Sequence, residues 1–104
     1  MTRTVELSSQ QTSGSVSVGD EILVRLQESP TTAFQWVLVS HGPGLELLHD
    51  ELAVPSTDRP PGAAAQRRLR FRAVDAGIAR VELALRRSWE ETVSERYTAT
   101  ITIT

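Results

Sequence analysis

The stretch Val16-Ser17-Val18-Gly19-Asp20-Glu21-Ile22-Leu23-Val24-Arg25-Leu26-Gln27 alternates apolar and polar side chains on both sides of a central turn signal. A period of two residues is typical of β-strands, in which successive side chains point to opposite faces of a sheet. One strand face is therefore expected to consist of Val16, Val18, Ile22, Val24 and Leu26. Gly19-Asp20 has the length of a hairpin turn, but a corner that passes the chain between two sheets would look the same.

The same alternation recurs further along the chain, at 67–73, 80–86 and 97–103. The stretch 34–39 carries apolar residues at most positions, as expected of a strand that is buried on both sides. Asp75-Ala76-Gly77 predicts a three-residue turn in which the glycine has a positive φ. Residues 45–52 fit either a short helix or a bulged strand, and clustered prolines predict a long exposed loop over Pro55–Gly62.

Seven or eight short strands, with turn signals between them and no convincing long helix, predict an all-β fold. The spacing of the turns favours an immunoglobulin-like β-sandwich. The chain contains no cysteine, so the Cys…Trp…Cys signature of antibody domains is absent and the likeness is one of architecture. Since its 104 residues contain neither an internal repeat nor a linker, the chain is expected to form a single domain over residues 1–104.

Composition narrows the classes of function. The absence of cysteine excludes disulfides, thiolate catalysis and zinc–thiolate sites, and all 11 basic residues are arginine, which excludes lysine Schiff-base chemistry. The formal net charge of −2 gives no sign of a nucleic-acid or anionic-membrane partner, and no apolar run is long enough for a membrane helix. The N-terminus lacks the apolar core of a signal peptide, which leaves a cytoplasmic chain, or a periplasmic or secreted domain whose leader has been removed.

Side chains suited to catalysis or metal binding are few. His41 and His49 are the only side chains whose ordinary pKa lies near neutrality, and neither has the spacing of a metal-binding pair. Both lie in turn-rich stretches, where a surface position is expected. Glu90-Glu91 adjoins Arg86-Arg87, as in the solvated rim of a loop, and no G-x-S-x-G nucleophile motif occurs. The sequence therefore indicates neither an enzyme nor a cofactor or metal site.

Arg68, Arg70 and Arg72 are expected to project from one face of a strand. Such a stripe could bind an anion. Pairing across the sheet with Glu82 and other acids is the favoured interpretation, because acidic residues outnumber basic ones by 13 to 11 in the chain.

Two further segments carry no reactive group, yet both are suited to contact with a partner. Between two strand patterns, Ser29–Trp36 is an uncharged turn in which Pro30 forbids a helix and the threonines favour extended backbone. It can present backbone groups and two threonine hydroxyls. Trp89 follows a strand whose inward positions are apolar, and it is either a cap on one end of the sandwich or an exposed anchor of the kind found in interfaces.

These segments resemble, in order and spacing, the contact loops of chagasin-type inhibitors of papain-like cysteine peptidases. Ser29–Phe34 is similar to the family's Asn-Pro-Thr-Thr-Gly-Phe loop, Gly62–Ala65 falls at its Gly-x-Gly-Gly loop, and Arg87–Trp89 falls at its Arg-Pro-Trp loop. The resemblance extends from about Ser13 to Thr104. It implies an immunoglobulin-like sandwich with three loops at one end, which wedge into the peptidase cleft with the central loop nearest the catalytic Cys-His pair. The implied contact residues are Ser29, Pro30, Thr31, Thr32, Ala33, Phe34, Gly62, Ala63, Ala64, Ala65, Arg87, Ser88 and Trp89.

The chain departs from the family pattern in each of these loops. Ser29 replaces asparagine in the central loop, where its hydroxyl can still cap the turn. Ala33 replaces a glycine in the same loop, and Ala64 and Ala65 replace two more in the second. If the backbone has a positive φ at these positions, each alanine costs about 1–2 kcal/mol. In the third loop Ser88 replaces proline, which loosens the turn.

Two functions are compatible with these features. The first is a reversible, non-covalent inhibitor of papain-like cysteine peptidases, which acts as a monomer and needs no cofactor. The second is an immunoglobulin-like binding or accessory module that has kept the scaffold without the inhibitory activity. An exposed Trp89 favours the first function, and a Trp89 packed into the core favours the second.

Overall fold

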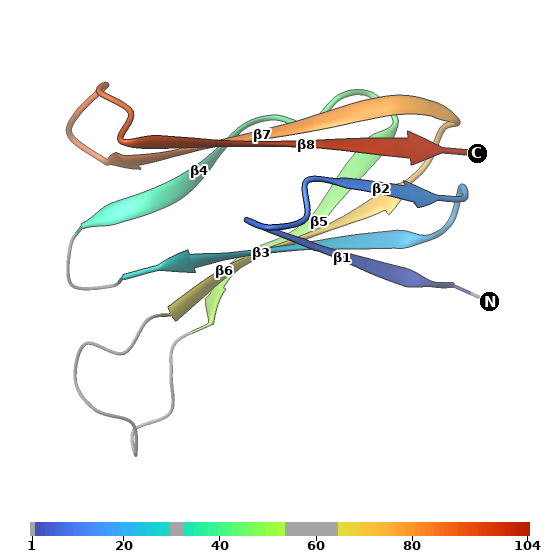
Figure 1. The fold of residues 1–104 in the computed structure, drawn as a ribbon, viewed down its shortest axis with the longest axis horizontal. Coiled ribbons are helices and arrows are strands. Elements are labelled where there is room, and N and C mark those ends of the chain that lie inside the picture. Colours follow the sequence, from blue (N-terminus) through green and yellow to red (C-terminus); the bar gives the residue numbers. More distant parts are fainter. Residues whose placement is uncertain (1, 30–32, 54–64) are drawn as a thin grey trace, which may run out of the picture.

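The computed structural model describes residues 2–29, 33–53 and 65–104. These residues form eight strands, which are β1 (Thr4–Ser8), β2 (Ser13–Val16), β3 (Glu21–Glu28), β4 (Phe34–Ser40), β5 (Leu45–Ala53), β6 (Ala65–Ala73), β7 (Gly77–Arg87) and β8 (Glu95–Ile103). They make two four-stranded sheets, in the orders β1-β3-β6-β5 and β2-β8-β7-β4, which face each other as two layers (Figure 1). The predicted all-β sandwich is confirmed. Within the described ranges, no helix is long and apolar enough to cross a membrane.

The two sheets are joined by a corner at Gly19-Asp20, because β2 and β3 belong to different sheets. The corner is therefore not a hairpin. Gly19 has a φ of +96°, and the carboxylate of Asp20 accepts hydrogen bonds from the amide nitrogens of Ser17 (2.9 Å) and Arg3 (3.2 Å). These bonds lower the pKa of the Asp20 carboxyl below its usual value.

The core lies between the sheets and is built from the alternating positions of their strands. Its largest fully buried side chains are Phe71, Leu7, Ile22, Leu69, Leu83, Ile101, Val16, Val24 and Val81. Four of the five residues predicted to share an inward face are buried, and the fifth, Val18, is 51% exposed. The exception arises because β2 ends at Val16, so that Val18 already belongs to the corner.

Edge strands account for two further differences from the expected pattern. β4 is the outer strand of its sheet, and Val39 on its outer face is 55% exposed. The prediction that this strand is buried on both sides was therefore wrong, because no third layer among the described residues covers that face. β5 is the edge strand of the other sheet, and its pairing with β6 shifts register between Leu47 and His49. Of the two predictions for residues 45–52, the bulged strand is confirmed and the short helix is wrong.

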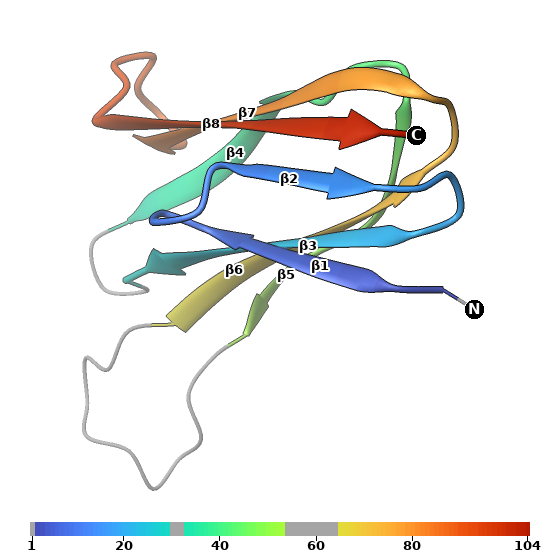
Figure 2. The ribbon, with the colours of Figure 1, turned by 45° about the vertical axis from the view of Figure 1, so that its right-hand side comes forward.

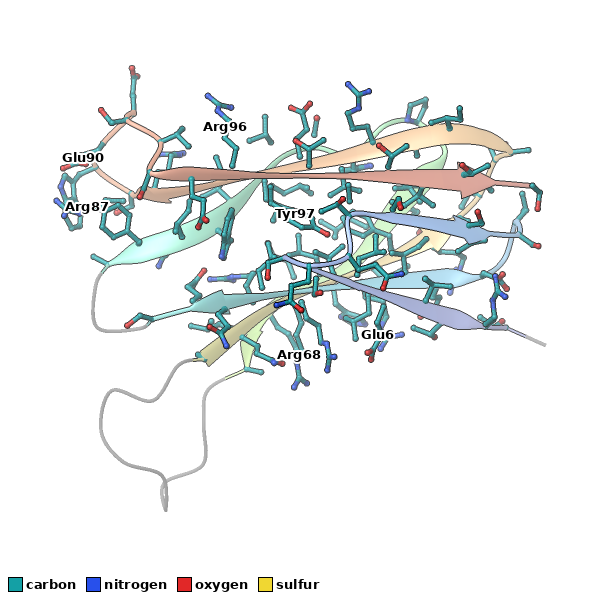
Figure 3. All side chains as sticks on the ribbon, viewed as in Figure 1. Glu6, Arg68, Arg87, Glu90, Arg96 and Tyr97 are labelled. Atoms are coloured by element: carbon teal, nitrogen blue, oxygen red, sulfur yellow. The ribbon has the colours of Figure 1, made fainter. Side chains whose placement is uncertain are left out.

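The arginine stripe lies on the outer face of the β1-β3-β6-β5 sheet. Arg70 forms an ion pair of 2.8 Å with Glu21, and Arg68, which projects away from the sandwich (Figure 3), hydrogen-bonds Gln66 at 3.3 Å. Pairing with an acid is confirmed for Arg70, but the expected partner Glu82 was wrong. Glu82 lies in β7, which belongs to the other sheet, so it cannot reach this face.

The strand ends place three connections at one end of the sandwich. There β3, β5 and β7 end and β4, β6 and β8 begin, while the N- and C-termini lie at the opposite end (Figures 1 and 2). This loop-bearing end therefore holds the described parts of all three segments that resemble contact loops. The turn at Asp75-Ala76-Gly77 lies at the other end, and Gly77 has the expected positive φ, at +136°.

Candidate functional site

The central connection joins β3 to β4 across the two sheets. Pro30, Thr31 and Thr32 lie outside the described residues, whereas Ser29 directly follows β3 and Ala33 directly precedes β4. Ala33 has a φ of +64°, the only positive φ of a non-glycine residue in the described ranges. The backbone at this position therefore has the positive φ under which alanine is strained. A left-handed conformation costs an L-residue other than glycine about 1–2 kcal/mol.

A buried acid ties the two ends of the central connection together. The side chain of Glu28, the last residue of β3, is 1% exposed. Its Oε1 accepts a hydrogen bond from the amide of Trp36 in β4 at 2.7 Å. In return, the indole Nε1 of Trp36 donates to the carbonyl oxygen of Gln27 at 2.9 Å. Because β3 and β4 lie in different sheets, these two bonds hold the sheets together directly below the central connection.

Glu28 is also bound by Arg67, which comes from β6. The guanidinium donates from Nε to Oε1 at 3.2 Å and from Nη2 to Oε2 at 2.9 Å, while its Nη1 reaches Asp50 in β5 at 3.2 Å. Burial lowers the pKa of Arg67, but the hydrogen bonds and charges of Glu28 and Asp50 outweigh it and raise the pKa overall. The guanidinium is therefore held charged, and it links β6, from which it comes, to the neighbouring strands β3 and β5.

The Glu28–Arg67 pair was not predicted, although the sequence contains a signal for it. Arg67 continues the inward positions of Leu69 and Phe71, and Glu28 continues those of Val24 and Leu26. A charged side chain at an inward position requires a buried partner of opposite charge. Two such positions of opposite sign therefore point to a buried ion pair.

The second connection is described only at its two ends. Gly62, Ala63 and Ala64 lie outside the described residues. Ala65 is the first residue of β6, where it is buried and pairs with Glu28 of β3. The side chain of Ala65 thus belongs to the interior.

The third connection is a turn held by its own hydrogen bonds. The amide of Glu90 donates to the carbonyl oxygen of Arg87 at 3.1 Å, and Arg86 Nη1 donates to the carbonyl oxygen of Glu90 at 3.1 Å. Arg87 also forms an ion pair with the carboxylate of Glu90 at 3.2 Å, and the two side chains lie together at the tip of the sandwich (Figure 3). Ser88 is exposed, and the side chain of Trp89 is 68% exposed. A Trp89 that caps the core is thereby excluded.

Arg87 also links the third connection to the central one. It lies opposite Phe34 in the pairing of β7 with β4, and its guanidinium carbon is 4.5 Å from the centroid of the Phe34 ring. A cation above an aromatic face at this distance is attracted to it. The central connection is therefore tied to one neighbour through Arg67 and to the other through Arg87.

The histidines take no part in this end of the molecule. His41 packs against Phe71, with ring centroids 5.8 Å apart, and His49 is exposed on β5. The surface position expected for His49 is confirmed, but it lies in a strand rather than in a turn. Among the residues that the structure describes, no group of three or more His, Cys, Asp or Glu side chains could hold a metal ion.

Comparison with known proteins connects this geometry to a family. The model of the chagasin family of peptidase inhibitors, I42, matches residues 15–103. No curated protein matches the chain. Among solved structures, the chain is similar to the cysteine protease inhibitor EhICP2 from Entamoeba histolytica, with a TM-score of 0.83 and 19% identity over 99% of this chain and 97% of that one.

Two more solved structures share the fold. Amebosin matches with a TM-score of 0.78 and 19% identity, over 98% of both chains. PbICP-C, whose structure was determined in complex with falcipain-2, matches with a TM-score of 0.67 and 14% identity, over 98% of this chain and 90% of that one. At these identities the likeness establishes the fold.

Proposed function

The chain belongs to the chagasin family of peptidase inhibitors, and from this membership we propose that it inhibits papain-like cysteine peptidases reversibly, without a covalent bond. The loop-bearing end of the sandwich fills the active-site cleft and blocks the substrate. Residues 1–104 act as one inhibitor domain. The structure of PbICP-C in complex with falcipain-2 supports a peptidase as the class of partner.

The observation that carries this proposal is the exposure of Trp89. Its side chain is 68% exposed on a turn that three contacts of Glu90 hold in place. A large aromatic side chain that is exposed on an ordered turn is ready to bury its surface against a partner, and such residues are enriched among those that dominate binding energy. This favours the inhibitor over a module that uses the same scaffold for another purpose.

The proposed contacts divide into three groups. Ser29–Phe34 enters the cleft, because an uncharged segment can be desolvated without burying an ion. Trp89, with Ser88 beside it and Arg87 holding the turn, forms the apolar contact on one flank, and Gly62–Ala64 forms the other. Ala65 contributes through the position of its backbone, since its side chain is buried. A rigid sandwich that carries all three groups reduces the ordering cost of binding.

The test is a titration of papain activity with the purified protein. We expect competitive inhibition, with an inhibitor that remains uncleaved by mass spectrometry after long incubation. If a stoichiometric excess leaves papain and cathepsin-type enzymes fully active, the chain is an accessory module instead. Ile78→Ala is a matched control, because Ile78 is 78% exposed at the opposite end of the sandwich and should not contribute to inhibition.

A further inference from the structure

The ion pair between Glu28 and Arg67 is unusual in its burial. The side chains are 1% and 15% exposed, whereas the two side chains of the other β3–β6 pair, Glu21 and Arg70, are 21% and 35% exposed. Removing two charges from water largely offsets their attraction, and buried ion pairs can often be replaced by uncharged groups without loss of stability. A requirement for stability is therefore a poor explanation of this pair.

The position of the Glu28–Arg67 pair offers a better explanation of its burial. Glu28 binds the amide of Trp36 on the far side of the central connection, and Arg67 binds Asp50 on β5. β5 and β6 are the strands from which the second connection leaves and to which it returns, at Ala53 and Ala65. One continuous set of hydrogen bonds thus joins the bases of two connections that lie in different parts of the sequence.

We infer that Glu28 and Arg67 are positioning residues of the inhibitor, which hold the bases of the central and second connections in a fixed relative arrangement. This inference rests on the proposed function in what it says of binding. Connections whose bases are fixed in advance lose less conformational freedom when they bind, so the pair acts on affinity without touching the peptidase.

The experiment compares two double variants of the full chain. Glu28→Gln with Arg67→Met removes both charges but keeps an oxygen that can accept from the Trp36 amide. Glu21→Gln with Arg70→Met is the matched control, because it removes an ion pair between the same two strands on the outer face of the sheet. The readouts are the melting temperature, the amide chemical shifts and relaxation of Ala33, Ala53 and Ala65, and the inhibition constant for papain.

We expect the first variant to melt near the parent temperature, with altered and more mobile amides on both bases. Its inhibition constant should rise roughly tenfold, mostly through faster dissociation, because the two bases must then be ordered on binding. The control should match the parent in amides and inhibition. Arg67→Lys, which keeps the charge but loses the paired hydrogen bonds to Glu28, is a second variant for the same readouts if the double variant does not fold.

Unchanged amides on the two bases would overturn the inference, whatever happens to inhibition. Changed amides with parental inhibition would overturn it as well, since affinity would not depend on the arrangement. If the parent itself does not inhibit, the amide shifts still decide whether the pair positions the two bases, while the inhibitor proposal fails separately.

Discussion

Ala33 and Trp89 are the residues of the loop-bearing end whose individual conformation bears most directly on the proposed binding. Ala33 holds the backbone left-handed where glycine would do so without strain. Trp89 presents most of its side chain to solvent on a turn that its neighbours fix. One residue therefore carries strain, and the other carries unburied apolar surface.

Replacing Ala33 with glycine should raise the free energy of unfolding by up to about 1 kcal/mol, because the relief of strain exceeds the entropy that glycine adds to the unfolded chain. Urea unfolding measures this change. Ala76→Gly is the control, since Ala76 also lies in an exposed turn but without a positive φ, and it should lower stability by about 0.5–1 kcal/mol. A loss of stability in both variants would contradict the assignment of strain to Ala33.

Replacing Trp89 with alanine should weaken inhibition by on the order of 2 kcal/mol, since the indole is the largest apolar surface of the three connections. The circular dichroism spectrum and melting temperature should stay at the parent values, because the side chain is exposed. Thr31→Ala should likewise weaken inhibition without unfolding the protein. A Trp89→Ala protein that unfolds would mean that the indole supports the core.

At the scale of elements, the corner between β2 and β3 and the connection between β3 and β4 perform the same task with different chemistry. Both carry the chain from one sheet to the other, and in both a carboxylate accepts hydrogen bonds from backbone amides. Asp20 does so beside Arg3, whose side chain is 64% exposed, and Glu28 does so beside Arg67, whose side chain is 15% exposed. The electrostatic consequences of losing each should therefore differ.

Arg67→Met alone should destabilise the protein by about 3–5 kcal/mol, because the charge of Glu28 remains buried without its partner. The double variant with Glu28→Gln should recover most of that loss. Arg70→Met, which breaks the more exposed pair with Glu21, should change stability by at most about 1 kcal/mol. Urea unfolding at neutral pH measures all three, and equal losses for Arg67→Met and Arg70→Met would contradict the difference in burial.

The corner at Asp20 should contribute to acid sensitivity. Hydrogen bonds from the amides of Ser17 and Arg3 lower the pKa of Asp20 below 3.8, so its stabilisation is complete above that pH and is lost as the pH falls through the folded-state pKa. Asp20→Asn should therefore show a shallower fall in melting temperature below about pH 4. Val18→Ala, in the same corner, removes no titrating group and should keep the parent slope.

At the scale of the whole molecule, the two sheets close over a core that includes one phenol. Tyr97, the only tyrosine of the chain, lies buried between the sheets (Figure 3), and its hydroxyl donates to the carbonyl oxygen of Gln11 at 3.2 Å. Burial raises its pKa from 10.0 to about 12, because the phenolate would lose hydration in the interior.

The raised pKa of Tyr97 makes alkaline stability a test of core packing. The unfolded chain releases the phenolic proton near pH 10.0 and the folded chain at about 12, so stability should fall as the pH rises through this interval. Ultraviolet absorbance of the single tyrosine measures the folded pKa. Tyr97→Phe should lose about 1 kcal/mol at neutral pH and should show less of the alkaline fall. A phenol that titrates near 10 in the folded protein would show that the sheets do not exclude water there.

The sequence by itself determined the strand class, the inward faces of most strands and the order of the three segments that resemble contact loops. These features are local, since side chains in a strand alternate whatever lies beside the strand. Only the tertiary structure decided that Gly19-Asp20 crosses between sheets, that Val39 is exposed on an edge, and that Glu82 lies away from the arginine stripe. It also decided that Arg67 meets Glu28 and that Trp89 stays exposed. Partners and exposure depend on which strands become neighbours, and that choice is made by contacts between residues far apart in the chain.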